Sequence, residues 1–287
     1  MTSADWMYVV VRALAFIAVL QAAGLAFFTR CFGQRLRASE APIRRLSAAS
    51  ALASLCLVVV QHALESARMT GELGGVWDPE MQRRVLESTI GLATAMRLGG
   101  LGLILAGIAR RDLAPPWTTV VGSLFVTISF AVTGHTSSHA QRWLLAPLLA
   151  GHVTIAAWWF GSVPALYLAC GRESGARLAA VLAAFSARAV WVVPLIAAAG
   201  LWIAFVLIPD RAALYSAYAA LLLAKIGLFA SLMGIAALNK WRLAPRVLRD
   251  PIAATAALRR SLLVEYVMIG AVLAVTATLT SQFSPEP

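Results

Sequence analysis

The chain has 287 residues, of which 60% are hydrophobic and 13% are charged, whereas ordinary globular domains have roughly 45–50% and 25%. The mean hydropathy is +0.79, and apolar runs of about 20 residues, each long enough to cross a hydrocarbon core about 30 Å thick, recur along the sequence. These values exclude a soluble enzyme and predict an all-α, polytopic membrane protein. The net charge of +11 does not indicate nucleic acid, because Lys and Arg accumulate in the cytoplasmic loops of membrane proteins.

Eight apolar segments, bounded by charges, Pro or Gly, are predicted to cross the membrane as helices. They are 7–28, 48–64, 90–108, 117–133, 147–169, 187–208, 215–238 and 262–280. We interpret residues 1–287 as a single transmembrane domain. The first segment contains Arg12 and no Lys or Arg precedes it, so it is predicted to be an uncleaved helix and not a signal peptide.

The basic residues sort by loop and predict the orientation. The loops after the first, third, fifth and seventh segments hold 15 Lys and Arg residues, and those on the other side hold five. Because basic loops stay in the cytoplasm, both termini are predicted to lie outside, in the periplasm. Cys31 and Cys170 then lie at cytoplasmic ends of predicted helices, and Cys56 lies within the second one. No disulfide is therefore expected.

The four histidines, His62, His135, His139 and His152, all map to the outer half of this topology. His135 follows the segment 117–133, and a helix that continued past it would place His139 on the same face, four residues later. With Pro147 in the first turn of the next helix, His152 would lie five residues in, about 8 Å deep.

These imidazoles predict a metal site. Imidazole suits copper, zinc, iron and nickel, and no carboxylate lies between His135 and His152, which argues against calcium and magnesium. We expect His135 and His152 to be the main ligands, with His139 and His62 as further ligands. For His62 and His139 the alternative is an ordinary role as interfacial side chains.

Three charged residues lie within predicted spans. Arg97 and Lys225 each lie about 13 residues from the cytoplasmic end of their span, about 20 Å along a helix and too far to reach the surface comfortably. Glu265 lies about one turn from the inner end of the last span. All three are candidates for the transport pathway or its gating, with neutralisation of basic neighbours as the alternative for Glu265.

Five segments follow one another in a recognisable order: Thr133-Gly134-His135-Thr136-Ser137, His152 through Trp159-Phe160-Gly161, Tyr218 to Lys225, Ala237-Leu238-Asn239-Lys240, and Leu258-Arg259-Arg260 through Glu265. Together they resemble the CopD copper-resistance membrane proteins, including the membrane part of CopC–CopD fusions. The resemblance is strongest over residues 117–281, and the chain departs from it at Ser162, where the family usually carries a second Gly.

The resemblance implies a multi-pass protein of the bacterial cytoplasmic (inner) membrane, surrounded by lipids, that takes up or handles periplasmic copper as Cu(I) or Cu(II). We expect uptake through the outer histidine site and no enzymatic activity. We expect no soluble copper-binding extension on this chain, so any CopC-like periplasmic donor is expected to be a separate protein. Two alternatives are a haem-binding electron-transfer protein, since two histidines on facing helices can ligate haem, and an assembly factor for copper enzymes that does not transport.

Overall fold

The structure is a computed structural model that describes the chain apart from residues 1–2, 111–113, 116, 135–138, 208–216 and 283–287. The described residues form helices and connecting turns, with no strand among them. The α-helices are α1 (Ser3–Phe32), α2 (Glu40–Thr70), α3 (Pro79–Glu87), α4 (Thr89–Ala109), α5 (Thr118–Ile128), α7 (Arg142–Cys170), α8 (Gly175–Leu207), α9 (Ala217–Leu238) and α10 (Pro251–Gln282). Short 3-10 helices cover Gly33–Arg35, Leu73–Trp77, Ser129–Ala131 and Ala244–Leu248, and a π-helix covers Asn239–Leu243.

Seven helices within the described ranges are long and apolar enough to cross a membrane: α1, α2, α4, α7, α8, α9 and α10. The segment 117–133, predicted as an eighth span, is a shorter apolar helix, Thr118–Ala131. Its 14 residues rise about 21 Å at 1.5 Å per residue, less than the thickness of a hydrocarbon core. The expected eight spans are therefore seven membrane-length helices and one short helix.

Several helices begin well before the apolar segment that predicted them. α2 begins at Glu40 and α10 at Pro251, because a helix continues through charged residues in water while hydropathy marks only its apolar part. Two expectations are corrected as a result. Pro147 lies inside α7 and not in its first turn, and Glu265 lies in the middle of α10 and not one turn from its inner end.

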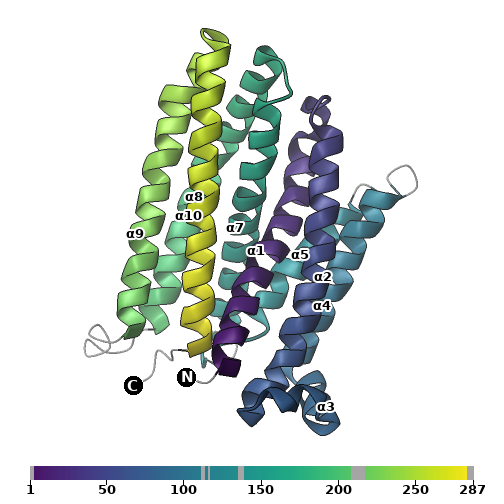
Figure 1. The fold of residues 1–287 in the computed structure, drawn as a ribbon. Helices are drawn as coiled ribbons and strands as arrows, with labels where there is room; N and C mark the ends of the chain where they lie inside the picture. The colour runs from purple at the N-terminus through teal and green to yellow at the C-terminus, as the bar shows by residue number, and fades with distance from the viewer. Residues whose placement is uncertain (1–2, 111–113, 116, 135–138, 208–216, 283–287) are drawn as a thin grey trace.

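The long helices form one bundle (Figure 1). α1 begins and α10 ends at the same end of the bundle, which also carries α3 (Figure 1). We call this the α3 end. If the charge-based orientation holds, the α3 end faces the periplasm, and that assignment remains a prediction.

α1 and α7 form the densely packed centre of the bundle. In their most apolar stretches 56% and 67% of the residues are buried, compared with 17% in α8 and 6% in α9. α1 and α7 touch backbone to backbone, since a Cβ atom on Gly24 would lie 1.8 Å from the carbonyl oxygen of Ala157. One on Gly161 would lie 2.2 Å from the carbonyl carbon of Gly24. Small residues permit such close crossings in membrane bundles.

A second close crossing sets the depth at which α5 ends. Cβ atoms on Gly100 of α4 and Gly122 of α5 would each lie 2.5 Å from the other residue's carbonyl oxygen. Further along the pair, Arg97 bonds to Ser129. Arg97 lies eight residues from the start of α4, which is about 12 Å along the helix. The helix that begins with α5 therefore stops well short of the α3 end.

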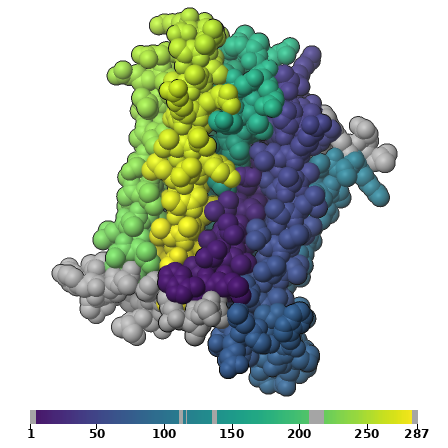
Figure 2. Space-filling view, in the orientation of Figure 1, coloured from purple at the N-terminus to yellow at the C-terminus, as the bar shows by residue number. Residues whose placement is uncertain are grey.

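α3 is a short polar helix that the hydropathy pattern did not predict. The Asp78 side chain accepts hydrogen bonds from the backbone N–H groups of Glu80 and Met81, at 2.9 and 3.1 Å. Pro79 occupies the first helical position, where its missing N–H costs nothing. Figure 2 shows α3 and the neighbouring end of α2 projecting beyond the rest of the bundle.

Candidate functional site

A cavity of about 210 Å³ lies at the α3 end, among residues of α1, α2, α4, α10 and the segment after α5. Its lining includes His62, Glu65 and three arginines, Arg12, Arg68 and Arg97. We call it the arginine cavity. It brings together two residues predicted from sequence, His62 and Arg97, with charged groups that were not predicted as site residues.

His62 has one ring nitrogen without a partner inside this cavity. Its Nδ1 lies 3.2 Å from Thr94 Oγ1, whereas its Nε2 is buried and makes no hydrogen bond to the described residues. A buried neutral imidazole needs a partner for each nitrogen. Nε2 therefore has an unused capacity to bind a metal ion or to form a hydrogen bond.

His135 lies outside the described residues, but Gly134, which precedes it directly, lines the arginine cavity with His62. Gly134 adopts the left-handed conformation, with φ at +89°, and the helix before it ends at Ala131. The helix expected to continue through His135 to His139 has therefore ended before His135. His139 is half-buried, and its Nδ1 accepts a hydrogen bond from the Gln141 backbone N–H at 3.1 Å.

His152 lies away from the arginine cavity, between α7 and α8. Its Nδ1 is 3.0 Å from the backbone oxygen of Ile196; since a carbonyl only accepts, this geometry assigns the proton to Nδ1 and leaves the lone pair on Nε2. A Cβ atom on Gly200 would lie 3.2 Å from the His152 ring. Lys225 of α9 is near enough for its charge to act on the ring.

The side of α7 that carries His152 is turned away from α5. Two positions further along α7, the Thr154 hydroxyl donates to Thr127 Oγ1 of α5 at 2.9 Å. Two residues on an α-helix differ by about 200° in direction. His152 consequently points toward α8, and the segment that follows α5 and contains His135 starts from the opposite side of α7.

The predicted histidines do not form one compact cluster in the part of the chain that the structure describes. No three His, Cys, Asp or Glu side chains gather there as a metal site, and His62, His139 and His152 stand apart. Because His135 lies outside the described residues, the site expected from all four histidines stays a prediction.

Arg97 is 8% exposed and has no carboxylate within ion-pair distance among the described residues. Its Nε donates to Ser129 Oγ at 3.0 Å, and its guanidinium lies 4.5 Å from the centre of the Phe130 ring. A desolvated cation–π contact is worth about 2 kcal/mol, whereas an ion removed from water loses several kcal/mol of solvation. These contacts alone do not offset the burial of the charge.

Glu65 is the carboxylate of the arginine cavity. It is 2% exposed and accepts a hydrogen bond from Arg68 Nη2 at 2.7 Å. Glu65 was not predicted as a site residue, although its sequence context carries a signal. Gln61, Glu65 and Arg68 follow one another at spacings of four and three within an apolar run, which places them on one face of a helix.

Glu265 and Lys225, predicted for the pathway, have different surroundings. Glu265 is 4% exposed and accepts a short hydrogen bond from the Asn239 amide, at the start of the π-helix. Lys225 is half-buried in the middle of α9. Next to Glu265, the Tyr266 hydroxyl donates to Gln21 of α1, whose amide donates to Ser50 of α2 at 2.6 Å. This polar connection across three helices was not predicted.

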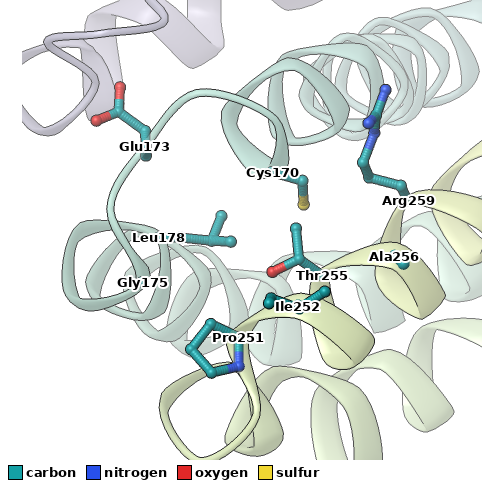
Figure 3. Close-up of a pocket in the computed structure, with 9 residues that line it drawn as sticks. All are labelled: Cys170, Glu173, Gly175, Leu178, Pro251, Ile252, Thr255, Ala256 and Arg259. Atoms are coloured by element: carbon teal, nitrogen blue, oxygen red, sulfur yellow. The ribbon is translucent and has the colours of Figure 1, made fainter.

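A second cavity, of about 330 Å³, lies at the opposite end of the bundle and is lined by Cys170, Glu173, Thr255 and Arg259 among others (Figure 3). Glu173 Oε1 accepts hydrogen bonds from the backbone N–H groups of Ala38 and Ser39, both at 2.9 Å. It thereby joins the α7–α8 connection to the start of α2. The described lining of this cavity contains one thiol and no imidazole.

In the part of the chain that the structure describes, a helical bundle with seven apolar helices of membrane length and several buried charged side chains defines a multi-pass membrane protein. Residues 2–143 match the family model for the copper resistance protein D-like N-terminal domain, and residues 179–279 match that for copper resistance protein D. The chain belongs to the CopD family of copper-resistance membrane proteins. No curated protein and no solved structure matches it.

The family matches confirm the resemblance seen in the sequence and extend it. The first match covers the N-terminal half, where the sequence offered only hydrophobic spans, and this half includes most of the arginine cavity. Membership of the family makes copper handling at a membrane the general function of the chain.

Proposed function

We propose that the chain carries copper across the cytoplasmic membrane, inward from the α3 end, by means of imidazole ligands at two depths. The family matches support copper as the cargo. The excess of Lys and Arg in the loops opposite the α3 end supports this end as the periplasmic one. Both the direction and the ligands belong to the proposal.

The orientation of His152 is the observation that carries the proposal. A metal-binding histidine almost always donates its second ring N–H to a carboxylate, a carbonyl or water, which fixes the tautomer and turns the other nitrogen toward the metal. The Ile196 carbonyl occupies this position for Nδ1 of His152. Nε2 is then prepared to bind copper, for which imidazole is a suitable ligand.

His62 and His135 are the proposed outer ligands. His62 lines the arginine cavity and has a buried, unpartnered Nε2, and Gly134 brings the chain to this cavity one residue before His135. His139 is proposed as a secondary ligand, because its Nδ1 already accepts a hydrogen bond from the Gln141 N–H. A separate CopC-like periplasmic protein would deliver copper to this outer pair.

Copper would pass from the outer pair to His152, and Lys225 would act as a gate. A protonated ammonium within range of the His152 ring repels a cation bound there. Movement or deprotonation of Lys225 would remove this barrier. Arg97 would control the outer step and Glu265 the inner one, as the buried charged groups of α4 and α10.

The test is uptake of Cu(I) into liposomes that contain the purified chain and a trapped copper-sensitive dye. His152→Ala should reduce uptake and copper affinity by more than 10–100-fold, the loss that is typical when a residue hydrogen-bonded to a metal ligand is replaced. His139→Ala, which removes an imidazole from a turn, should have a smaller effect and serves as the matched control.

Three outcomes would contradict the proposal. Uptake by the His152→Ala variant equal to that of the unmodified chain would remove His152 from the pathway. An intense haem Soret band that disappears with His152 would assign the histidine to electron transfer. Stoichiometric copper binding without any uptake would indicate an assembly factor.

A further inference from the structure

The arginine cavity holds more positive than negative charge. Its described lining contains Arg12, Arg68 and Arg97 but one carboxylate, Glu65. Glu65 is already bonded to Arg68 at 2.7 Å. Arg12 and Arg97 therefore lack a carboxylate within ion-pair distance among the described residues.

Each of these two guanidinium groups donates one side-chain hydrogen bond to a described residue, Arg12 to Tyr8 and Arg97 to Ser129. A guanidinium carries five N–H donors. Arg97 uses its Nε on Ser129 and covers Phe130 with one face. Arg12 donates through Nη1 to the Tyr8 hydroxyl at 3.0 Å, and its Nε is buried without a hydrogen bond. The remaining donors belong to side chains that line the cavity.

The two arginines also repel each other. They are near enough for the charge of Arg12 to act on Arg97, and the effect of a nearby charge grows as water is excluded. A buried cation such as Arg97, beside the half-buried Arg12, is costly unless an anion compensates it. An anion bound in the cavity would therefore stabilise the two neighbouring arginines.

We propose that the arginine cavity is a binding site for a phosphate group, held by Arg12 and Arg97. Arginine binds phosphate with paired N–H···O bonds. The several oxygens of a phosphate can bind two guanidinium groups at once, whereas a carboxylate forms such a pair with a single guanidinium group. The cavity volume of about 210 Å³ lies below the 300–1,000 Å³ of sites for drug-sized molecules. It therefore suits inorganic phosphate or the headgroup of a phospholipid.

The phosphate site shares its cavity with the proposed outer copper ligand His62, but its ligand is an anion, and it is tested without copper. The purified chain in detergent is titrated with inorganic phosphate by calorimetry, and retained phospholipid is measured by native mass spectrometry. Arg97→Gln and Arg12→Gln should each lower phosphate affinity about tenfold or more, because each removes a charge-assisted pair of hydrogen bonds. Arg84→Gln is the matched control, since Arg84 is an exposed arginine of α3 bonded to Glu80 at 2.7 Å.

The source of the phosphate is distinguished in the same experiment. A lipid headgroup is indicated if phospholipid co-purifies with the unmodified chain, is lost with Arg97→Gln, and blocks phosphate until it is removed. A free anion is indicated if phosphate binds with or without lipid. Both outcomes support the site.

The proposal is overturned if neither phosphate nor phospholipid binds, or if Arg97→Gln and Arg84→Gln bind phosphate equally well. Thermal unfolding identifies any variant that fails to fold. Arg97→Lys retains the charge and provides a second variant at the same position. It should bind phosphate more weakly than the unmodified chain, because an ammonium lacks the planar fork of the guanidinium.

Discussion

Replacing Gly24 by alanine is expected to force α1 away from α7 and to destabilise the bundle. The new Cβ atom would lie 1.8 Å from the carbonyl oxygen of Ala157 and 2.8 Å from the backbone nitrogen of Gly161. Carbon and oxygen normally approach no closer than about 3.3 Å. The obstructing atoms are backbone, so no side-chain rotation relieves the overlap, and the helices have to separate by about 1.5 Å.

The size of the effect follows from this separation. A gap of 0.5–1 Å already removes about a quarter to a half of the dispersion energy between two surfaces, and overpacking of a core typically costs about 1–3 kcal/mol. Because backbone meets backbone here, we expect about 3 kcal/mol or more. Without a close crossing, alanine would stabilise the helix by about 1 kcal/mol relative to glycine. A loss of stability in Gly24→Ala would therefore indicate that the two helices are in contact at this position.

The assay is thermal unfolding of the purified protein in detergent, followed by circular dichroism. With about 2–4 °C lost per kcal/mol in chains of this size, Gly24→Ala should lower Tm by about 6–12 °C. Gly227→Ala in α9 is the matched control, because a Cβ atom there meets nothing within 4 Å, and it should leave Tm unchanged or slightly higher. An unchanged Tm for Gly24→Ala would refute the close crossing.

Three further outcomes are expected. In a background without the native cysteines, a cysteine at Glu80 should react with a membrane-impermeant thiol reagent added outside and one at Gln34 should not; the reverse result would invert the topology. Lys225→Met should impair copper uptake into liposomes without lowering the amount of copper bound, and uptake at the original rate would make Lys225 structural. Gly200→Ala places a Cβ atom 3.2 Å from the His152 ring. By crowding the ring, it should lower copper affinity about 10–100-fold, as is typical of changes to residues that orient a metal ligand. Gly151→Ala, where the added atom meets nothing within 4 Å, should bind copper as before.

The long helices were predictable because hydrophobicity is a property of each segment by itself. All eight predicted segments contain helix, and hydropathy missed mainly their charged extensions. It also overestimated the segment 117–133, whose helix ends at Ala131 shortly before the left-handed Gly134. α3 was missed although Asp78 and Pro79 are a recognisable helix start, because a short polar helix has no membrane signal.

The candidate site was less predictable because it depends on which helices become neighbours and how each is rotated. The short connection between the segments 117–133 and 147–169 suggested that His135 and His152 face each other. In the structure Thr154 contacts α5, whereas His152, two residues earlier on the same helix, faces α8. Sequence spacing alone does not show which of these two residues faces α5. The arginine cavity needed α1, α2, α4 and α10 to meet, and no local pattern predicts that contact.

The sparse packing of α8 and α9 has a consequence for how the bilayer acts on the protein. Both helices expose large apolar side chains, among them Trp191, Phe205 and Leu223, which in a membrane face the hydrocarbon tails. Such helices tilt when the thickness of the hydrocarbon layer changes. Since α8 supplies the Ile196 carbonyl and α9 supplies Lys225, the lipid chain length acts directly on the hydrogen bond and the charge that surround His152.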